Sequence, residues 1–400
     1  MGKAPRITRP LTLALCLLLA LTGCAKKEAK RLTVWVPERG SYIGADEQKK
    51  AREEWYISQA FKRFEKANPG VTVVLVVEPE AAGAAGNAPD AADLAGWETM
   101  REEFAPGGRL LGYLGHALAL SFLFYNKDLV KQAGLDFEVN PPRTMEEFDA
   151  ALETIRKTGV VPIATDESFP WFNLRVAVYW WYQISGPDRI LKNCLGEEKF
   201  SEDKGLLSML DSYSSLWERG DVNGNAATSR DSWANFLQGK AALTPQVSTM
   251  MGEAIAALGA DNLGILAPPD IDTNAPFATG RVIGGATGAL VVSKGSKNPD
   301  LALKLLSFLN SRAETLELLK SQSFIPTRRD ITAVDAGLAP GSVQEQMFSY
   351  RDTFVPFIDT ILTPGVLDEY RTLCPLVLVG TMTPMQFALA LDAKAAELKK

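Results

Sequence analysis

The stretch Leu120–Phe148, LSFLFYNKDLVKQAGLDFEVNPPRTMEEF, decides how the chain is organised. It begins with Leu120–Phe124, an apolar run of the length of a buried strand. Lys127–Gly134 follows with the pattern of a short amphipathic helix, which the glycine ends. The stretch therefore predicts a strand and a short helix before the chain reaches its two prolines.

The second half of this stretch predicts a rigid joint and a new helix. Pro141 and Pro142 exclude helix where they stand, because proline lacks the backbone donor and restricts the residue before it. Thr144 and Glu147 form a capping box, in which each side chain accepts a hydrogen bond from the other residue's backbone N–H. A non-helical joint between two compact units suits a hinge, so we expect the chain to cross between two lobes here.

Nearer the amino terminus, the sequence predicts a strand, a helix and a second strand. Arg31–Val36 and Val71–Val77 are rich in β-branched residues, and both read as buried parallel strands. Between them, Asp46–Ala67 has apolar residues at helical spacing. Parallel strands joined by a helix need a right-handed crossover, so we predict an α/β fold with doubly wound sheets.

Length, charge and residue usage exclude several classes of function. A chain of 400 residues with 46% hydrophobic residues is long enough to indicate two domains. Its net charge of −6 argues against a nucleic-acid partner. His116 is the single histidine, which argues against a histidine-based metal site. No spacing singles out a pair of carboxylates for acid–base catalysis. We therefore expect no catalytic residues, no metal and no cofactor, with an enzyme as a minor alternative.

The amino terminus has the pattern of an export signal. Residues 1–23 carry a basic beginning and the apolar run Leu11–Leu21, which is too short to span a bilayer. Leu21–Cys24 has the pattern of a bacterial lipobox, which predicts cleavage before Cys24 and lipidation of its thiol. Residues 24–31 would then form a lipidated, mostly basic tether to a membrane.

Several motifs, in order along the chain, resemble one family: the extracellular solute-binding lipoproteins of ABC importers, in the sugar-binding branch that includes the maltose-binding proteins. The resemblance lies in Tyr125–Leu129 (YNKDL), Ala133–Leu135 (AGL), Pro141–Thr144 (PPRT), Trp233–Leu243 (WANFLQGKAAL) and Phe324–Arg328 (FIPTR). It covers nearly all of the chain that follows the signal.

This resemblance implies a two-lobed periplasmic-binding-protein fold whose lobes are joined by three crossings. The N-terminal lobe would contain residues 32–127 with 286–327, and the C-terminal lobe residues 128–285 with 328–400. The implied function is to capture a sugar or oligosaccharide in the interlobe cleft and to deliver it to the permease of an ABC importer. We expect a monomer in the cell envelope, anchored by lipid on the outer side of the cytoplasmic membrane or in the periplasm.

Sugar sites need flat rings for apolar C–H faces and fixed polar groups for hydroxyls. On that logic and by resemblance of position, the candidate ligand-binding residues are Trp35, Glu38, Asp90, Trp171, Trp233, Gly285 and Arg328. Trp171 follows Pro170 in the most aromatic part of the chain, and we expect it just before a helix, where its ring can project into a cleft. Alternatively, Trp35 belongs to the core and Arg328 pairs with an acid at the hinge.

Three questions stay open at this point. Leu94–Gly115 is short for the family, so the chain could instead be a surface or scaffolding lipoprotein that has lost solute binding. Another polar solute could replace sugar. Cys194 and Cys374 could form a disulfide, or each could be a separate buried thiol.

Overall fold

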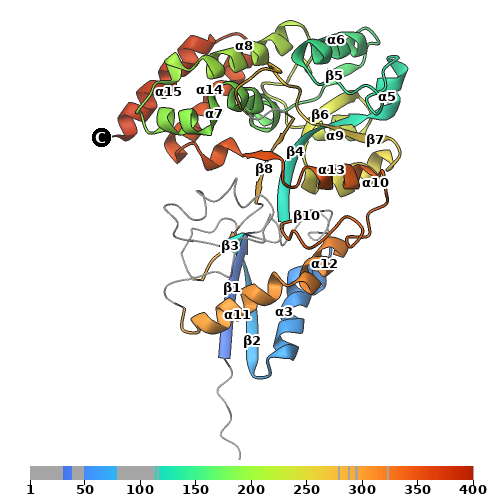
Figure 1. Ribbon diagram of the computed structural model, residues 1–400, viewed down its shortest axis with the longest axis vertical. Coiled ribbons are helices and arrows are strands. Elements are labelled where there is room, and N and C mark those ends of the chain that lie inside the picture. Colours follow the sequence, from blue (N-terminus) through green and yellow to red (C-terminus); the bar gives the residue numbers. More distant parts are fainter. Residues whose placement is uncertain are drawn as a thin grey trace, which may run out of the picture.

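The structure, a computed structural model, has two lobes of unequal size (Figure 1). It describes residues 30–37, 49–78, 113–114, 117–277, 280–286, 289–292, 296–321 and 324–399. The predicted signal, Cys24, Glu38, Asp90 and most of the stretch 94–115 lie outside these residues. Within the described ranges, no helix has the length and apolar character needed to cross a membrane.

The smaller lobe contains the predicted strand–helix–strand unit. Strands β1 (Lys30–Pro37) and β2 (Val71–Glu78) pair in parallel, and α3 (Tyr56–Ala67) connects them. Helices α11 (Pro299–Leu309) and α12 (Arg312–Ser321) complete this lobe. The parallel pair and its crossover helix are therefore confirmed.

The helix expected over Asp46–Ala67 is wrong for the described residues before Tyr56. The described residues before α3 contain a single short 3-10 turn, η1 (Arg52–Glu54). Trp55 then interrupts the helical path with an extended backbone, at ψ 141°. The apolar face that packs into the core begins only at Tyr56 and Ile57, so tertiary burial supports the helix from there on.

The larger lobe is built around strand β4 (Ala117–Asn126), whose ten residues are all buried. Four strands pair with it, all antiparallel: β6 (Ala241–Val247), β7 (Leu263–Leu266), β8 (Val282–Ala286) and β10 (Ile325–Pro326). β5 (Val161–Ile163) pairs in parallel with β6, and β11 (Phe354–Pro356) with β8. β4 is thus the centre of a mixed seven-stranded sheet.

Both faces of β4 are covered by core. Leu123 and Tyr125 point into the largest apolar cluster of the lobe, whereas Phe122 and Phe124 point into a second cluster on the opposite face. Ala117, at the beginning of the strand, belongs to the core of the smaller lobe. One strand therefore contributes to three apolar clusters, and this couples the lobes.

Helices cover both faces of this sheet (Figure 1). They are α5 (Lys127–Gln132), α6 (Met145–Arg156), the π-helical turn η3 (Asn173–Ala177), α7 (Val178–Cys194), α8 (Lys204–Glu218), α9 (Ser232–Leu237), α10 (Met251–Leu258), α13 (Val343–Ser349), α14 (Pro364–Leu378) and α15 (Pro384–Leu398). The capping box of Thr144 and Glu147 is confirmed at the beginning of α6. The rings of Tyr179–Tyr182 are fully buried and belong to the core of the larger lobe.

The expectation that the Pro141–Pro142 joint lies between the lobes is wrong. Helices α5 and α6, on either side of it, both belong to the larger lobe (Figure 1). Phe137, just before the joint, packs edge-on against Tyr125 of β4, which holds this segment to the same core. The crossings are instead made along β4, along β8 with β9 (Ala289–Leu290), and after β10 (Figure 1).

Cys194 and Cys374 are both free thiols, so the disulfide that we considered is not formed. Cys194 is the last residue of α7, whereas Cys374 lies within α14 close to Tyr370. Both are buried among apolar side chains, and burial raises the pKa of each thiol. They are separate core residues, which is the alternative that the sequence left open.

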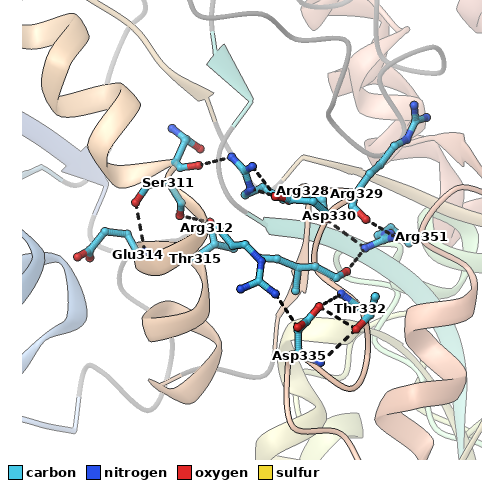
Figure 2. A network of polar contacts seen from close by, with 12 residues as sticks. Ser311, Arg312, Glu314, Thr315, Arg328, Arg329, Asp330, Thr332, Asp335 and Arg351 are labelled. Carbon is cyan, nitrogen blue, oxygen red and sulfur yellow. Dashed lines mark hydrogen bonds and ion pairs between the residues drawn. The ribbon is translucent and has the colours of Figure 1, made fainter.

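The third crossing is fixed by a network of polar contacts (Figure 2). Arg328 donates to the carbonyl of Asn310 at the end of α11 (2.9 Å) and pairs with both carboxylate oxygens of Asp330 (2.8 and 2.7 Å). From the larger lobe, Arg351 donates to the carbonyls of Arg328 (3.1 Å) and Ile331 (2.6 Å). The segment after β10 is therefore held by both lobes.

We predict that Arg351→Ala destabilises the protein by about 1–3 kcal/mol, because charged hydrogen bonds to two backbone carbonyls are lost. Arg329→Ala is the matched control, since Arg329 also contacts Asp352 but its side chain is 46% exposed, against 15% for Arg351. The control should change stability by less than about 0.5 kcal/mol. Urea unfolding measures the stability of both variants. Equal losses of stability would contradict a specific role of the Arg351 hydrogen bonds at the third crossing.

A buried acid lies in the core of the larger lobe. Glu167 accepts hydrogen bonds from the Thr165 hydroxyl (2.5 Å), the Phe172 backbone N–H (2.8 Å) and the Tyr213 hydroxyl. Burial raises the pKa of Glu167 to about 7, although these hydrogen bonds oppose the rise. Tyr370 and Cys374 lie near the Glu167 carboxyl group, and neither supplies a positive charge that would stabilise its ionised form.

We predict that this acid makes stability depend on pH. Because the pKa of Glu167 is higher in the folded state, its contribution is fully present below about pH 4.5 and is lost as the pH rises through 7. Between pH 5 and 8 the loss should be on the order of 2–3 kcal/mol. Unfolding free energies over this range should fall less steeply for Glu167→Gln, whereas Glu153→Gln, which removes an exposed carboxylate of α6, should retain the slope of the unchanged protein.

Candidate functional site

Two neighbouring rings, Phe169 and Trp171, are exposed on the larger lobe. Their centroids are 4.4 Å apart, and 38% and 37% of their surfaces are exposed, in contrast to the buried rings of α7. Trp171 lies in the first helical turn leading into η3, and not before the helix as expected. The pair presents a broad aromatic surface at the beginning of this helix.

An arginine packs against one of these two rings, Trp171. Arg175, in the π-helical turn η3, places its guanidinium 4.9 Å from the Trp171 ring centroid and 4.6 Å from that of Phe357. Its Nε is buried, and the side chain forms no hydrogen bond or ion pair with any other described residue. Burial lowers the pKa of Arg175 to about 10. Single π-helical turns are frequent at functional sites.

A second arginine reaches the same rings from α14. The guanidinium of Arg371 lies 5.0 Å from the Phe169 ring centroid and 3.5 Å from the carboxylate of Asp359. Its Nε is also buried and has no hydrogen-bond partner among the described residues. We refer to Phe169, Trp171, Arg175, Phe357 and Arg371 as the ring–arginine cluster.

This cluster lies where β8 leaves the large sheet. Phe357 follows β11, and its backbone N–H donates to the carbonyl of Gly284 in β8 (3.0 Å). A Cβ at Gly285 would lie 2.9 Å from the Phe357 ring, so this position needs glycine. Gly285 in β8 pairs with Ala119 in β4. Ala119 lies two residues along the strand, or about 7 Å, from Ala117, which belongs to the core of the smaller lobe. The cluster is therefore close to the boundary between the lobes.

The other predicted site residues do not join this cluster. Trp233 packs against Phe124 and Phe236 on the opposite face of the sheet, and its Nε1 donates to Glu253 (3.1 Å). Arg328 is engaged in the third crossing, as in the alternative that the sequence left open. The backbone of Trp35 lies in β1, but its side chain is outside the described part of the structure.

Of the predicted site residues, Trp171 and Gly285 lie at this cluster, whereas the residues that connect them were not predicted. Arg175 could have been found, because it is the only charged residue between Trp171 and Gly186 and stands four positions after Trp171, one helical turn away. Phe357 and Arg371 come from the last fifty residues of the chain. Their proximity to Trp171 follows only from the tertiary structure.

The cluster combines flat apolar rings with strong hydrogen-bond donors. Rings cover the apolar face of a ligand, and guanidinium groups bind its acceptor oxygens. Elsewhere in the larger lobe, a groove of about 520 Å³ lies between the segment 135–143 and α6. Within the described ranges, no group of three or more histidine, cysteine, aspartate or glutamate side chains is placed to hold a metal ion.

Comparisons with solved structures show the same fold. The chain aligns with a chitin oligosaccharide binding protein at a TM-score of 0.72 and 17% identity, covering 93% of this chain and 99% of the other. It aligns with the sugar-binding protein MalE from Xanthomonas citri at a TM-score of 0.71 and 18% identity, covering 92% and 97% of the two chains. The two-lobed fold predicted from the sequence is thereby confirmed.

Comparisons of sequence identify the family. A binding protein of Brucella abortus (strain 2308) is 25% identical over 247 residues, which are 60% of this chain and 56% of the relative, so the chain spans about half the length of that relative. The sequence profile of the family described as bacterial extracellular solute-binding protein matches residues 50–315. Because this match covers well over half of the chain, the protein belongs to the bacterial extracellular solute-binding protein family.

Proposed function

We propose that the protein captures a sugar or oligosaccharide between its lobes and delivers it unchanged to the permease of an ABC importer. The observation that carries this proposal is the exposed pair of Phe169 and Trp171 beside the boundary between the lobes. Aromatic rings stack on the C–H faces of sugars, and neighbouring donors hold the hydroxyl groups. The descriptions of the two structural neighbours as oligosaccharide-binding and sugar-binding proteins support the same class of cargo.

Binding would act through closure of the lobes. A ligand that contacts both lobes has a higher affinity for the closed form and shifts the population toward it. The sequence-based limits of the lobes are residues 32–127 with 286–327 and 128–285 with 328–400. Because β4 lies in the sheet and core of the larger lobe, we propose that the first limit is instead at the beginning of β4. Trp35, Glu38 and Asp90 are our proposed contacts from the N-terminal lobe, and Gly285 would accommodate Phe357 as the lobes move.

We propose that the protein acts at the outer side of the cytoplasmic membrane or in the periplasm. The extracellular family supports a location in the cell envelope. Lipidation of Cys24 after removal of residues 1–23 would anchor the chain, and the basic tether would let the lobes reach a membrane permease. Processing at Cys24 can be checked by the mass of the mature amino terminus.

We predict that a thermal-shift screen with sugars, oligosaccharides, amino acids and short peptides gives a shift for one class of saccharide. At one hundred times the Kd, a ligand adds about 2.7 kcal/mol of stability, which raises the Tm by a few degrees. Trp171→Ala should weaken binding by on the order of tenfold or more, because about 100 Å² of apolar contact is lost. Calorimetric titration measures the change in Kd.

The matched control is Leu389→Ala, which removes an exposed apolar side chain from α15, away from the lobe boundary (Figure 1). It should leave the Kd unchanged. Chromatography of the ligand after incubation should recover it intact. If no compound shifts the Tm although the protein melts cooperatively, or if the ligand is converted, the proposal of a sugar-capturing subunit is wrong.

A further inference from the structure

The ring–arginine cluster has more positive charge than a neutral sugar requires. Arg175 and Arg371 lie among its three rings, and Asp359 is the one carboxylate that contacts either guanidinium within the described residues. Hydroxyl groups of a neutral sugar need no net charge in their site. The cluster therefore has one uncompensated positive charge among the residues that the structure describes.

The uncompensated positive charge belongs to Arg175, because Asp359 forms its ion pair with Arg371. Burial disfavours the charged form of Arg175, Asp359 favours that form, and Arg371 disfavours it by less than Asp359 favours it. The buried Nε of Arg175 has no hydrogen-bond acceptor among the described residues, and a buried donor without an acceptor is unfavourable. Packing over two rings supports the flat guanidinium but supplies no oxygen acceptor. A group with two acceptor oxygens and negative charge would satisfy both needs.

We propose that the solute is an acidic saccharide, whose anionic group binds Arg175 while its sugar ring stacks on Trp171. This inference rests on the proposed function and narrows it to one class of cargo. The Arg175 guanidinium lies over the Trp171 ring, 4.9 Å from its centroid, so a sugar stacked on the exposed part of that ring would bring an attached anionic group to the edge of the guanidinium. Arg371 lies over the neighbouring ring of Phe169 and adds to the positive potential there.

The test compares acidic and neutral saccharides of equal length by calorimetric titration of the purified protein. Uronate oligosaccharides, sulfated disaccharides and sugar phosphates are measured beside the corresponding neutral sugars, so that carboxylate, sulfate and phosphate are distinguished. We expect at least one acidic series to bind tenfold or more tightly than its neutral counterpart. Its affinity should fall between 0.05 and 0.5 M salt, because the pairing is electrostatic, whereas that of the neutral sugars should not.

Arg175→Gln should reduce the ratio of acidic to neutral affinity at least tenfold. Arg175→Lys retains the charge without the planar fork and should restore part of that ratio, which separates binding of the anion from a merely structural role. Arg329→Gln, at an exposed arginine that contacts Asp352 at the third crossing, is the matched control and should leave the ratio unchanged. The unfolding curve of each variant shows whether it has folded.

Two outcomes would overturn the inference and can be told apart. If neutral saccharides bind as tightly as acidic ones, or if folded Arg175→Gln and Arg175→Lys retain the full ratio, the acidic specificity is wrong and the sugar-binding function stands. If neither series binds, the proposed function itself fails, and the acidic specificity fails with it.

Discussion

The structure depends on the complete burial of strand β4. A strand with core on both faces cannot turn a backbone group to water, so its N–H and C=O groups need partners from neighbouring strands. Four antiparallel partners meet this need, and they come from widely separated parts of the sequence. Because β4 begins in the smaller-lobe core at Ala117 and ends in the larger lobe, the same constraint that builds the sheet also joins the two lobes.

The position of the candidate site follows from this arrangement. β8 pairs with the first half of β4 and leads the chain back toward the smaller lobe, and β11 continues beside it. Phe357, the first residue after β11, therefore reaches the lobe boundary and packs over Gly285. The π-helical turn places the Arg175 guanidinium against the ring of Phe357. Residues nearly two hundred positions apart in the sequence therefore form one surface. A sheet edge thus positions these side chains where, under the proposed function, a ligand between the lobes would contact them.

Local signals predicted much of the fold, and they failed where packing decides. The capping box at Thr144, the apolar strand at Leu120–Phe124 and the parallel crossover of the smaller lobe are encoded within a few residues, so they were predicted correctly. Pro141–Pro142 has the pattern of a rigid joint, but the sequence does not say which core each side of a joint enters. For the same reason Trp233 resembled a ligand contact, although the fold places it on the opposite sheet face from Trp171.

The environment of Arg175 links stability to recognition. A guanidinium that is already desolvated by folding has less hydration to lose when a ligand arrives, so its attraction for an anion is offset less than that of an exposed arginine. The burial of Arg175 is unfavourable, and a charged solute would relieve it. Because lobe closure would further exclude water from this boundary, the attraction would be strongest in the closed form. Charge recognition and closure would then favour the same state, which is the differential affinity that a population shift requires.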